Sequence, residues 1–512
     1  MLNMGDAPAG ASRGSRFEHP LNYYRLTMNL SARTVLVTLV AAAVGLAVAV
    51  GAARAVKPDT VTVPKYEPVH PTSDAPTERR PVGAVGCMAA ACHGAPAGEL
   101  LNGRSGPDTW AASGSCWAAA DPHTAAYSLL TDRPRRSVVV TAARIMAKYR
   151  PGVKATDDAR CLACHTNPTL AELPATTEVV ALREQGVSCE ACHGNAGQWI
   201  QPHTGWTGDR AQVYRETGLK PLYDMGERAV TCAGCHVGAP ADGSNPVRDM
   251  NHDMIAAGHP RLNFDFAEYQ RRLPKHWHEK ERTSGAAKLN ESQVWYVGRL
   301  AHAETACRLL GSRAQRTEAN DARTVWPEFA EFNCAACHHN LRAPEEDGGH
   351  WRKSAEYLDG RPIGSTPWQT IWPVTHAPGL PQPRRATSEV AALVRLMEGE
   401  TGQTWPDGRP KVLRFAKAPD AKGLALATAD ALAAARREAA AGTKGPPPGL
   451  FPAGAPLVPE WDSAEQLFFG LAAREYARGA PAAGTVQKYR TGVDAFRARD
   501  WLKVKDVFTG LR

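Results

Sequence analysis

Cysteine and histidine recur together in this chain at a spacing that can hold a prosthetic group. Four copies of Cys-x-x-Cys-His occur: Cys161-Leu-Ala-Cys164-His165, Cys189-Glu-Ala-Cys192-His193, Cys232-Ala-Gly-Cys235-His236 and Cys334-Ala-Ala-Cys337-His338. In such a motif the two thiols can form thioethers with the two vinyl groups of a porphyrin, and the adjoining histidine can ligate its iron. The repeated motif therefore predicts covalently attached haem c.

A stretched copy of the motif, Cys87-Met-Ala-Ala-Ala-Cys92-His93, stands upstream of the other four. Its extra residues must bulge out between thiols whose spacing the porphyrin fixes. Cys-x4-Cys-His is an attested haem-binding variant, so we expect haem here too; a disulfide or two free thiols are the alternatives. The sequence thus predicts five haem c groups, and four at minimum.

Cys-x-x-Cys pairs also occur in zinc sites and in thiol–disulfide oxidoreductases. Zinc sites usually couple two pairs into one tetrahedral centre and do not place histidine directly after every second cysteine. A redox-active pair would need a thioredoxin-like setting, and one pair would be enough. Both alternatives fit the pattern less well than haem does.

The second axial position of each haem iron separates electron carriers from enzymes. Carriers usually fill it with His or Met, whereas catalytic haems leave it open. Usable histidines outnumber the haems, so we expect most irons to have two protein ligands. The candidate distal ligands, with the two favoured ones first, are His123, His259, His203, His252 and His302.

Four other histidines are not expected to bind iron. Three of them flank Lys or Trp in charged stretches and should be solvated: His276, His278 and His350. The fourth, His339, adjoins His338 and must point away from that haem.

The N-terminal part of the chain reads as an export signal. Residues 34–53 form an uncharged apolar run of 20 residues that is followed by Ala53-Arg54-Ala55. This ending resembles a signal-peptidase site, and the Ala and Gly content makes the run weakly hydrophobic for a membrane span. We expect residues 1–55 to be a cleaved signal peptide, with 1–27 a possible mis-called start, and a periplasmic or otherwise extracytoplasmic protein. An uncleaved anchor facing the periplasm is the alternative.

Composition divides the rest of the chain into four segments. Residues 56–82 form a Pro-rich leader, and residues 83–345 a multihaem domain in which short helical pieces alternate with Gly/Pro-rich loops. Residues 346–387 form a linker, and residues 388–512 a helical extension without haem, with Ala-rich helices near 388–399 and 422–441. We predict a mainly α fold, with a loop-rich haem core and a helical C-terminal extension.

Charge and the remaining motifs restrict the partners. The net charge of +8 is mild for 512 residues and is spread along the chain, which fits a redox partner protein with an acidic surface and argues against nucleic acid. No phosphate-binding Gly-rich loop or nucleophile elbow occurs. The two cysteines outside the motifs, Cys116 and Cys307, are expected to be small buried residues rather than a disulfide.

The order of these features resembles a known family. The run from Gly86 through His123 to Cys192-His193-Gly194, followed by residues 232–236 and 251–260, is similar to multihaem cytochromes of the cytochrome c554 type, within a wider group that includes hydroxylamine oxidoreductase-like proteins. The resemblance implies a mainly α fold, closely stacked haem pairs, mostly bis-His ligation and electron transfer. The chain departs from the family in its stretched motif, its site at residues 334–338 and its long tail.

The leading hypothesis is an exported pentahaem cytochrome that transfers single electrons between redox partners. A competing hypothesis is a multihaem oxidoreductase that acts on a small nitrogen or sulfur compound at one five-coordinate haem. Against it, no motif replaces the proximal His by Lys, as in pentahaem nitrite reductases, and hydroxylamine oxidoreductases carry more haem sites. A haem-bearing structural subunit is a third possibility, and whether the protein is an enzyme stays open at this point.

Overall fold

The computed structural model describes residues 81–96, 109–131, 140–205, 210–242, 245–260, 262, 264–277, 289–321, 324–331, 416–442 and 461–479, with scattered positions in 389–397 and 485–492. All of them belong to one compact unit, Ala75–Arg512. The expected signal segment, most of the leader, the linker and the motif at 334–338 lie outside the described residues.

Helices make up the regular structure of the described residues. The only β pairing there consists of two isolated bridges, Ala239–Arg248 and Asp242–Asn245. The prediction of a mainly α fold is confirmed. None of the described helices is long and apolar enough to cross a membrane.

The cavity described below is built from short helices joined by turns. The α-helices are α2 (Ala84–Cys87), α4 (Ser113–Ala120), α5 (Ala142–Tyr149), α6 (Ala159–His165), α7 (Thr177–Arg183), α8 (Cys189–His193), α9 (Ile200–Gly205), α10 (Arg210–Thr217), α11 (Met225–His236), α12 (His252–Ala257) and α13 (Phe266–Arg272). Between them lie 3-10 turns η1 (Thr109–Ala112), η2 (Pro122–Ala125), η3 (Tyr127–Leu129), η4 (Ala155–Asp157), η5 (Pro168–Leu170) and η6 (Ala196–Gln198). Helices this short are marginal on their own, so packing and capping must hold them.

Side-chain caps fix the starts of most of these helices. At each of six starts, an Asp, Asn or Thr oxygen accepts a hydrogen bond from a backbone N–H of the first turn, which satisfies a donor that the helix itself leaves open. The capping residues are Thr141, Asp158, Thr176, Asp224, Asn251 and Asp265.

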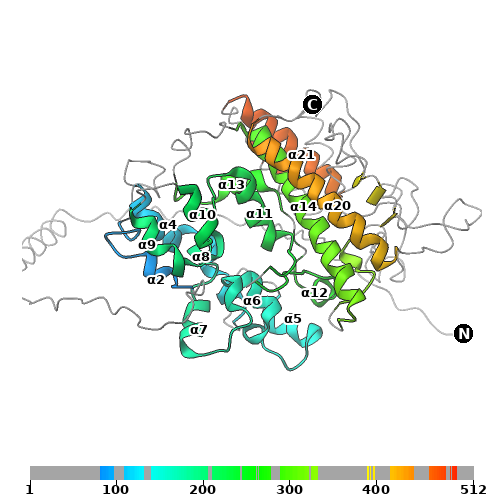
Figure 1. The fold of residues 1–512 in the computed structure, drawn as a ribbon, viewed down its shortest axis with the longest axis horizontal. Helices are drawn as coiled ribbons and strands as arrows, with labels where there is room; N and C mark the ends of the chain where they lie inside the picture. The colour runs from blue at the N-terminus through cyan, green and yellow to red at the C-terminus, as the bar shows by residue number, and fades with distance from the viewer. Residues whose placement is uncertain are drawn as a thin grey trace, which may run out of the picture. The chain divides into compact units, whose positions relative to one another are not determined.

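One long helix departs from the expected pattern of short pieces. Helix α14 (Glu291–Glu318) has 28 residues and begins with a capping box formed by Asn290 and Gln293. Figure 1 shows α20 (Ala418–Ala440) and α21 (Trp461–Ala477) running along α14, and α11 and α13 also pack on it. A helix buried on several sides lacks a strong apolar periodicity, which is why its length was not evident from the sequence.

The C-terminal helices share one hydrophobic cluster with the haem region. Alanines of α20, among them Ala421, Ala425 and Ala429, are fully buried with residues of α11, α13 and α14. A buried ion pair joins α20 to α14: Arg436 Nε lies 2.7 Å from Glu304 Oε2, and both side chains are 5% exposed. The extension is therefore part of the core that supports the cavity.

The two cysteines outside the motifs behave as expected. Cys116 is 1% exposed, Cys307 is completely buried, and both are free thiols. The prediction that they are buried and unpaired is confirmed.

Candidate haem-binding cavity

One large cavity collects the residues of four motifs. Its volume is about 1820 Å³, well above the roughly 300–1,000 Å³ of a pocket for a single small ligand. All eight motif cysteines that the structure describes line it: Cys87, Cys92, Cys161, Cys164, Cys189, Cys192, Cys232 and Cys235. Eight histidines line it as well: His93, His123, His165, His193, His203, His236, His259 and His276.

Three of the motifs occupy the C-terminal ends of helices. Helices α6, α8 and α11 each end at a motif histidine, at residues 165, 193 and 236. In an α-helix, residues three and four apart share a face, so both cysteines and the histidine of a motif project to one side. Caps at Asp158 and Asp224 set where α6 and α11 begin, and thus which side faces the cavity.

The stretched motif reaches the cavity by a turn. Helix α2 ends at Cys87, and the chain then folds back so that the backbone N–H of His93 donates to the Cys87 carbonyl at 3.2 Å. The Cys92 N–H donates to the Ala89 carbonyl at 2.8 Å. The extra residues are taken up in this turn, and Cys87, Cys92 and His93 still line the cavity.

Each motif histidine in the cavity faces a second histidine. The distances between ring centres are 6.3 Å for His93–His203, 6.1 Å for His236–His123, 6.4 Å for His165–His259 and 6.5 Å for His193–His276. The second histidines lie on different elements. His203 is in α9 and His123 is in η2. His259 follows Gly258, the left-handed cap of α12, and His276 lies in the loop after α13. We call these the His93, His236, His165 and His193 sites.

These separations suit one metal ion between two imidazoles. An iron about 2.0 Å from each nitrogen would place the ring centres roughly 6.3 Å apart, because a five-membered ring with bonds of about 1.35 Å has a radius of about 1.15 Å. The four observed distances lie between 6.1 and 6.5 Å. Two cysteines stand beside each pair, so the donor set of every site fits a bis-His haem c.

Hydrogen bonds at Nδ1 orient several of these rings. The Nδ1 atoms lie 2.6–2.9 Å from oxygen acceptors, which are Trp110 O for His93, Ala126 O for His165, Ile200 O for His203, Pro260 O for His259 and Asp121 Oδ1 for His123. With the Nδ1–H engaged as a donor, Nε2 is the nitrogen left for a metal.

Burial lowers the pKa of three motif histidines, which favours the neutral form that a metal ligand needs. Burial, reinforced by His276, lowers the pKa of His193 to about 3, and burial lowers the pKa of His236 to about 4. Burial also lowers the pKa of His165. Neutral imidazoles present a free lone pair at ordinary pH, which favours metal binding.

His276 contradicts the expectation from its charged neighbours. It is partly buried, lines the cavity and faces His193. Burial lowers its pKa. The adjoining Trp277 packs under the Arg228 guanidinium, 4.9 Å from the ring centre, which turns this loop inward. No local pattern in the sequence shows this contact, so the prediction that His276 is solvated was wrong.

The other two candidate distal ligands lie elsewhere. The cavity lining, as the described residues form it, includes neither His252 nor His302. The ring of His252 stands edge-on to Phe329, 5.8 Å between centres. His302 is 8% exposed on α14, and its ring lies 6.3 Å from that of Phe264. The structure brings neither of them to the motif histidines of the four sites.

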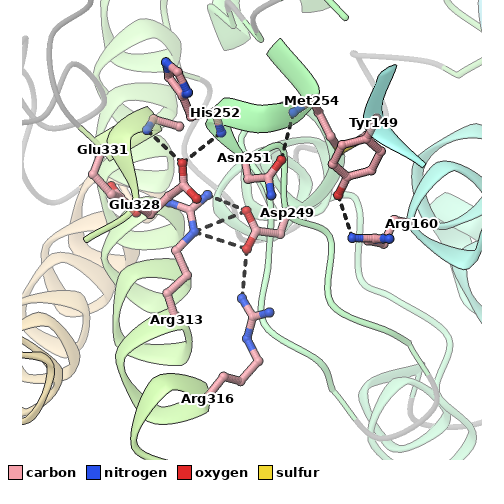
Figure 2. Close-up of polar contacts among 11 residues, drawn as sticks. Tyr149, Arg160, Asp249, Asn251, His252, Met254, Arg313, Arg316, Glu328 and Glu331 are labelled. Carbon is pink, nitrogen blue, oxygen red and sulfur yellow. Dashed lines mark hydrogen bonds and ion pairs between the residues drawn. The ribbon is translucent and has the colours of Figure 1, made fainter. Parts of the chain in front are cut away.

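A polar network next to the cavity anchors the segment that carries His252 and His259. Figure 2 shows Asp249, just before α12, between Arg313 and Arg316 of α14. Arg313 also pairs with Glu331 of η8 (Phe329–Glu331). Glu328, just before η8, adds a second anchor: its carboxylate accepts a hydrogen bond of 2.8 Å from the backbone N–H of His252 (Figure 2).

The motif cysteines of the cavity are not joined in disulfides. All eight in the cavity are free thiols. Among the described residues no group of three or more His, Cys, Asp or Glu side chains is arranged to hold a metal ion.

Contacts between cysteines of different motifs show which sites adjoin. The thiols of Cys87 and Cys189 lie close enough for each to shift the pKa of the other, and so do those of Cys164 and Cys235. Cys192 lies close enough to Cys235 for their charges to interact. The sites therefore follow one another in the order His93, His193, His236, His165, which differs from their order in the sequence.

The cavity also offers cationic partners for haem propionates. Four cationic side chains line it: Arg160, Lys220, Arg228 and Arg248. Guanidinium and ammonium groups form charge-assisted hydrogen bonds with carboxylates, so the electrostatics of the lining fit haem as well.

Comparison with known proteins agrees with these features. Residues 115–194 match the family model described as cytochrome c554 and c-prime. The matched segment holds His123 and the motifs at 161–165 and 189–193. No curated protein and no solved structure matches the chain. Proteins of the matched family carry haem c, serve in electron transfer and are typically extracytoplasmic. The match over residues 115–194 and the four histidine pairs together support a c-type cytochrome similar to those of the cytochrome c554 type.

Proposed function

We propose that this protein is an exported pentahaem cytochrome that passes single electrons between redox partner proteins. One observation carries the proposal: each motif histidine in the cavity faces a second histidine across 6.1–6.5 Å. Two imidazole ligands leave an iron no open position for a substrate, which is the arrangement of an electron carrier. The oxidoreductase hypothesis requires an open position and gains no support from these four sites.

The order of the sites supports a path for electrons. Haem c, when bound, supplies a reversible one-electron couple. The Cys87–Cys189 and Cys164–Cys235 pairs place neighbouring attachment points side by side, and Cys192 lies near Cys235, which links the two pairs. Electrons would enter near one end, at the His93 or His165 site, and leave near the other.

The side chains around the sites hold the ligands in fixed orientations. Hydrogen bonds at Nδ1 orient the rings, and burial lowers the pKa of His193 and His236, which keeps these two ligands neutral. A ligand set held in fixed orientations changes little when an iron gains or loses one electron, which favours fast transfer.

The fifth haem, export and the partners rest on the sequence. Residues 334–338 repeat the attachment motif, and residues 34–55 have the features of a cleaved signal. The family match supports a location outside the cytoplasm. The net charge of +8 supports a partner with an acidic docking surface.

The haem count is tested by the intact mass of the purified protein after acid–acetone extraction. We expect five covalent haems in the wild type and four in a Cys87→Ala/Cys92→Ala variant. A Cys161→Ala/Cys164→Ala variant is the matched control and should also lose one. If the Cys87→Ala/Cys92→Ala variant keeps the wild-type haem mass, the stretched motif is not an attachment site; fewer than four haems in the wild type would refute the cytochrome proposal.

Ligation is tested by the electron paramagnetic resonance (EPR) spectrum of the oxidised protein. We expect the irons of the four sites to be low-spin. His259→Ala should convert one of them to high-spin and allow cyanide to bind, without loss of haem mass, because the thioethers hold the porphyrin. Asp253→Ala, an exposed residue of the same segment, is the control and should change nothing. A strong high-spin signal from these sites in the wild type that responds to nitrite or hydroxylamine would favour the oxidoreductase hypothesis instead.

Export is tested by N-terminal sequencing of the mature protein. We expect the chain to begin directly after Ala55. A protein that retains residues 34–53 and stays in the membrane fraction after a carbonate wash would be membrane-anchored instead.

A further inference from the structure

One distal histidine has a carboxylate as its Nδ1 partner. Asp121 Oδ1 lies 2.8 Å from His123 Nδ1, and the Asp121 residue is 5% exposed. The same oxygen accepts the backbone N–H of His123 at 2.9 Å, because Asp121 is the N-cap of η2. The carboxylate is thus fixed by the backbone that carries the ligand.

This partner differs in kind from those of the other cavity histidines. Of the five whose Nδ1 contacts are described above, the other four lie against backbone carbonyls, which carry no net charge. Within the described residues, no lysine or arginine forms an ion pair with Asp121. The ion pair that Asp121 forms there is with the His123 ring itself, so its negative charge acts directly on this ligand.

We propose that Asp121 is a positioning residue that lowers the reduction potential of the haem that His123 and His236 would ligate. A carboxylate that accepts the Nδ1–H increases the basicity of the imidazole, and a more basic ligand stabilises the oxidised iron over the reduced iron. The inference rests on the proposed function, since it requires haem at this site.

The position of the site gives the lowered potential a role. The His236 site stands between the His193 and His165 sites in the order set by the cysteine contacts. A haem of low potential at this position would separate the His93 and His193 sites from the His165 site by a step that is uphill in energy for an electron. With haem bound, electrons that pass between the two sides would have to cross the site that His123 and His236 hold.

Asp121→Asn in the full holoprotein tests the inference. The amide oxygen of Asn can still accept the backbone N–H of His123, so the cap remains while the charge is lost. EPR-monitored potentiometric titration with mediators should show one low-spin haem moving to higher potential. The haem concerned is identified as the one that His123→Ala converts to high-spin. Ser113→Ala is the matched control, because Ser113 Oγ lies 2.9 Å from His93 Nδ1 and is uncharged; it should give a smaller shift.

Three outcomes would overturn the inference. The titration of Asp121→Asn superimposes on that of the wild type, or the shift occurs at another haem, or the His123 haem becomes high-spin, which would mean that Asp121 only holds the ligand in place. If the Asn variant does not fold, Asp121→Ser, which retains a capping oxygen without charge, is measured in its place. The haem mass and low-spin spectrum of the wild type are recorded first, so a failure of the proposed function is recognised before the variants are compared.

Discussion

Replacement of Arg313 should destabilise the protein more than replacement of its neighbour Arg316. Arg313 is 4% exposed and binds both Asp249 and Glu331, whose side chains are 13% and 5% exposed. Burial alone would lower the pKa of Arg313, but the two carboxylates outweigh it and raise the pKa. Burial would likewise raise the pKa of Asp249, yet Arg313 and Arg316 hold it below its usual value.

The structure sets the expected magnitudes. Arg313→Met keeps most of the aliphatic volume but leaves two buried carboxylates without their main cation, and breaking a buried pair in this way costs about 3–5 kcal/mol. Arg316 has one carboxylate partner and is 22% exposed, so Arg316→Met should cost about 1 kcal/mol or less. The difference between the two variants, at least about 2 kcal/mol, is the quantity to measure.

Urea unfolding of the holoproteins, followed by far-ultraviolet circular dichroism at pH 7, gives both free energies of unfolding. A triple variant, Arg313→Met/Asp249→Asn/Glu331→Gln, should recover much of the loss, because it removes the unpaired charges together with the cation. Equal losses in Arg313→Met and Arg316→Met, or no recovery in the triple variant, would refute the reasoning.

The same cluster predicts a pH dependence. Because the pKa of Asp249 is lowered in the folded state, its contribution is present above the unfolded value of about 3.9 and is lost as the pH falls through the lower folded value. The wild type should therefore lose stability in acid more steeply than the triple variant, which lacks this carboxylate.

Two further predictions concern single positions. Burial raises the pKa of Asp265 to about 6. The folded state therefore binds an extra proton between about pH 4 and 6, and the free energy of unfolding falls as the pH rises through that window. Asp265→Asn should remove this slope and stabilise the protein by up to about 3 kcal/mol at pH 7. At Gly186 (φ +70°), an added Cβ would lie 2.6 Å from the His123 carbonyl oxygen. Gly186→Ala should therefore cost about 1–3 kcal/mol and disturb the low-spin signal of the His123 haem. Gly152→Ala, at φ +84° with no atom within 4 Å of an added Cβ, should show only the backbone strain. An unchanged pH slope in the first case, or equal effects of the two glycine variants on the spectrum, would contradict these expectations.

The sequence allowed the attachment residues to be predicted because a short motif contains them. Cys161, Cys164 and His165 lie on one helix turn, and helix geometry alone brings them together. The distal partner of His165 is His259, 94 positions away, and no local rule connects the two. His259 could be proposed from the surplus of histidines, but its pairing depends on the packing of α12 on α5.

His276 shows the limit of reasoning from neighbouring residues. Lys275 and Trp277 suggested solvent exposure, yet Trp277 packs under Arg228, which lies 49 positions earlier. The length of α14 was also missed, since burial on several sides removes the apolar periodicity that marks shorter helices. In both cases long-range packing outweighed the local pattern.

The packing of α20 on α14 has a consequence for how the protein is made. Synthesis proceeds from the N-terminus, and Ala418 of α20 follows the last cysteine motif by 80 residues. Until α20 emerges, the face of α14 that it covers stays open, and the core behind the cavity is incomplete. The motif cysteines can therefore receive their haems on a chain that has not yet closed. A late-arriving helix that completes the core would act as the final step of maturation, locking the ligand pairs after the cofactors are in place.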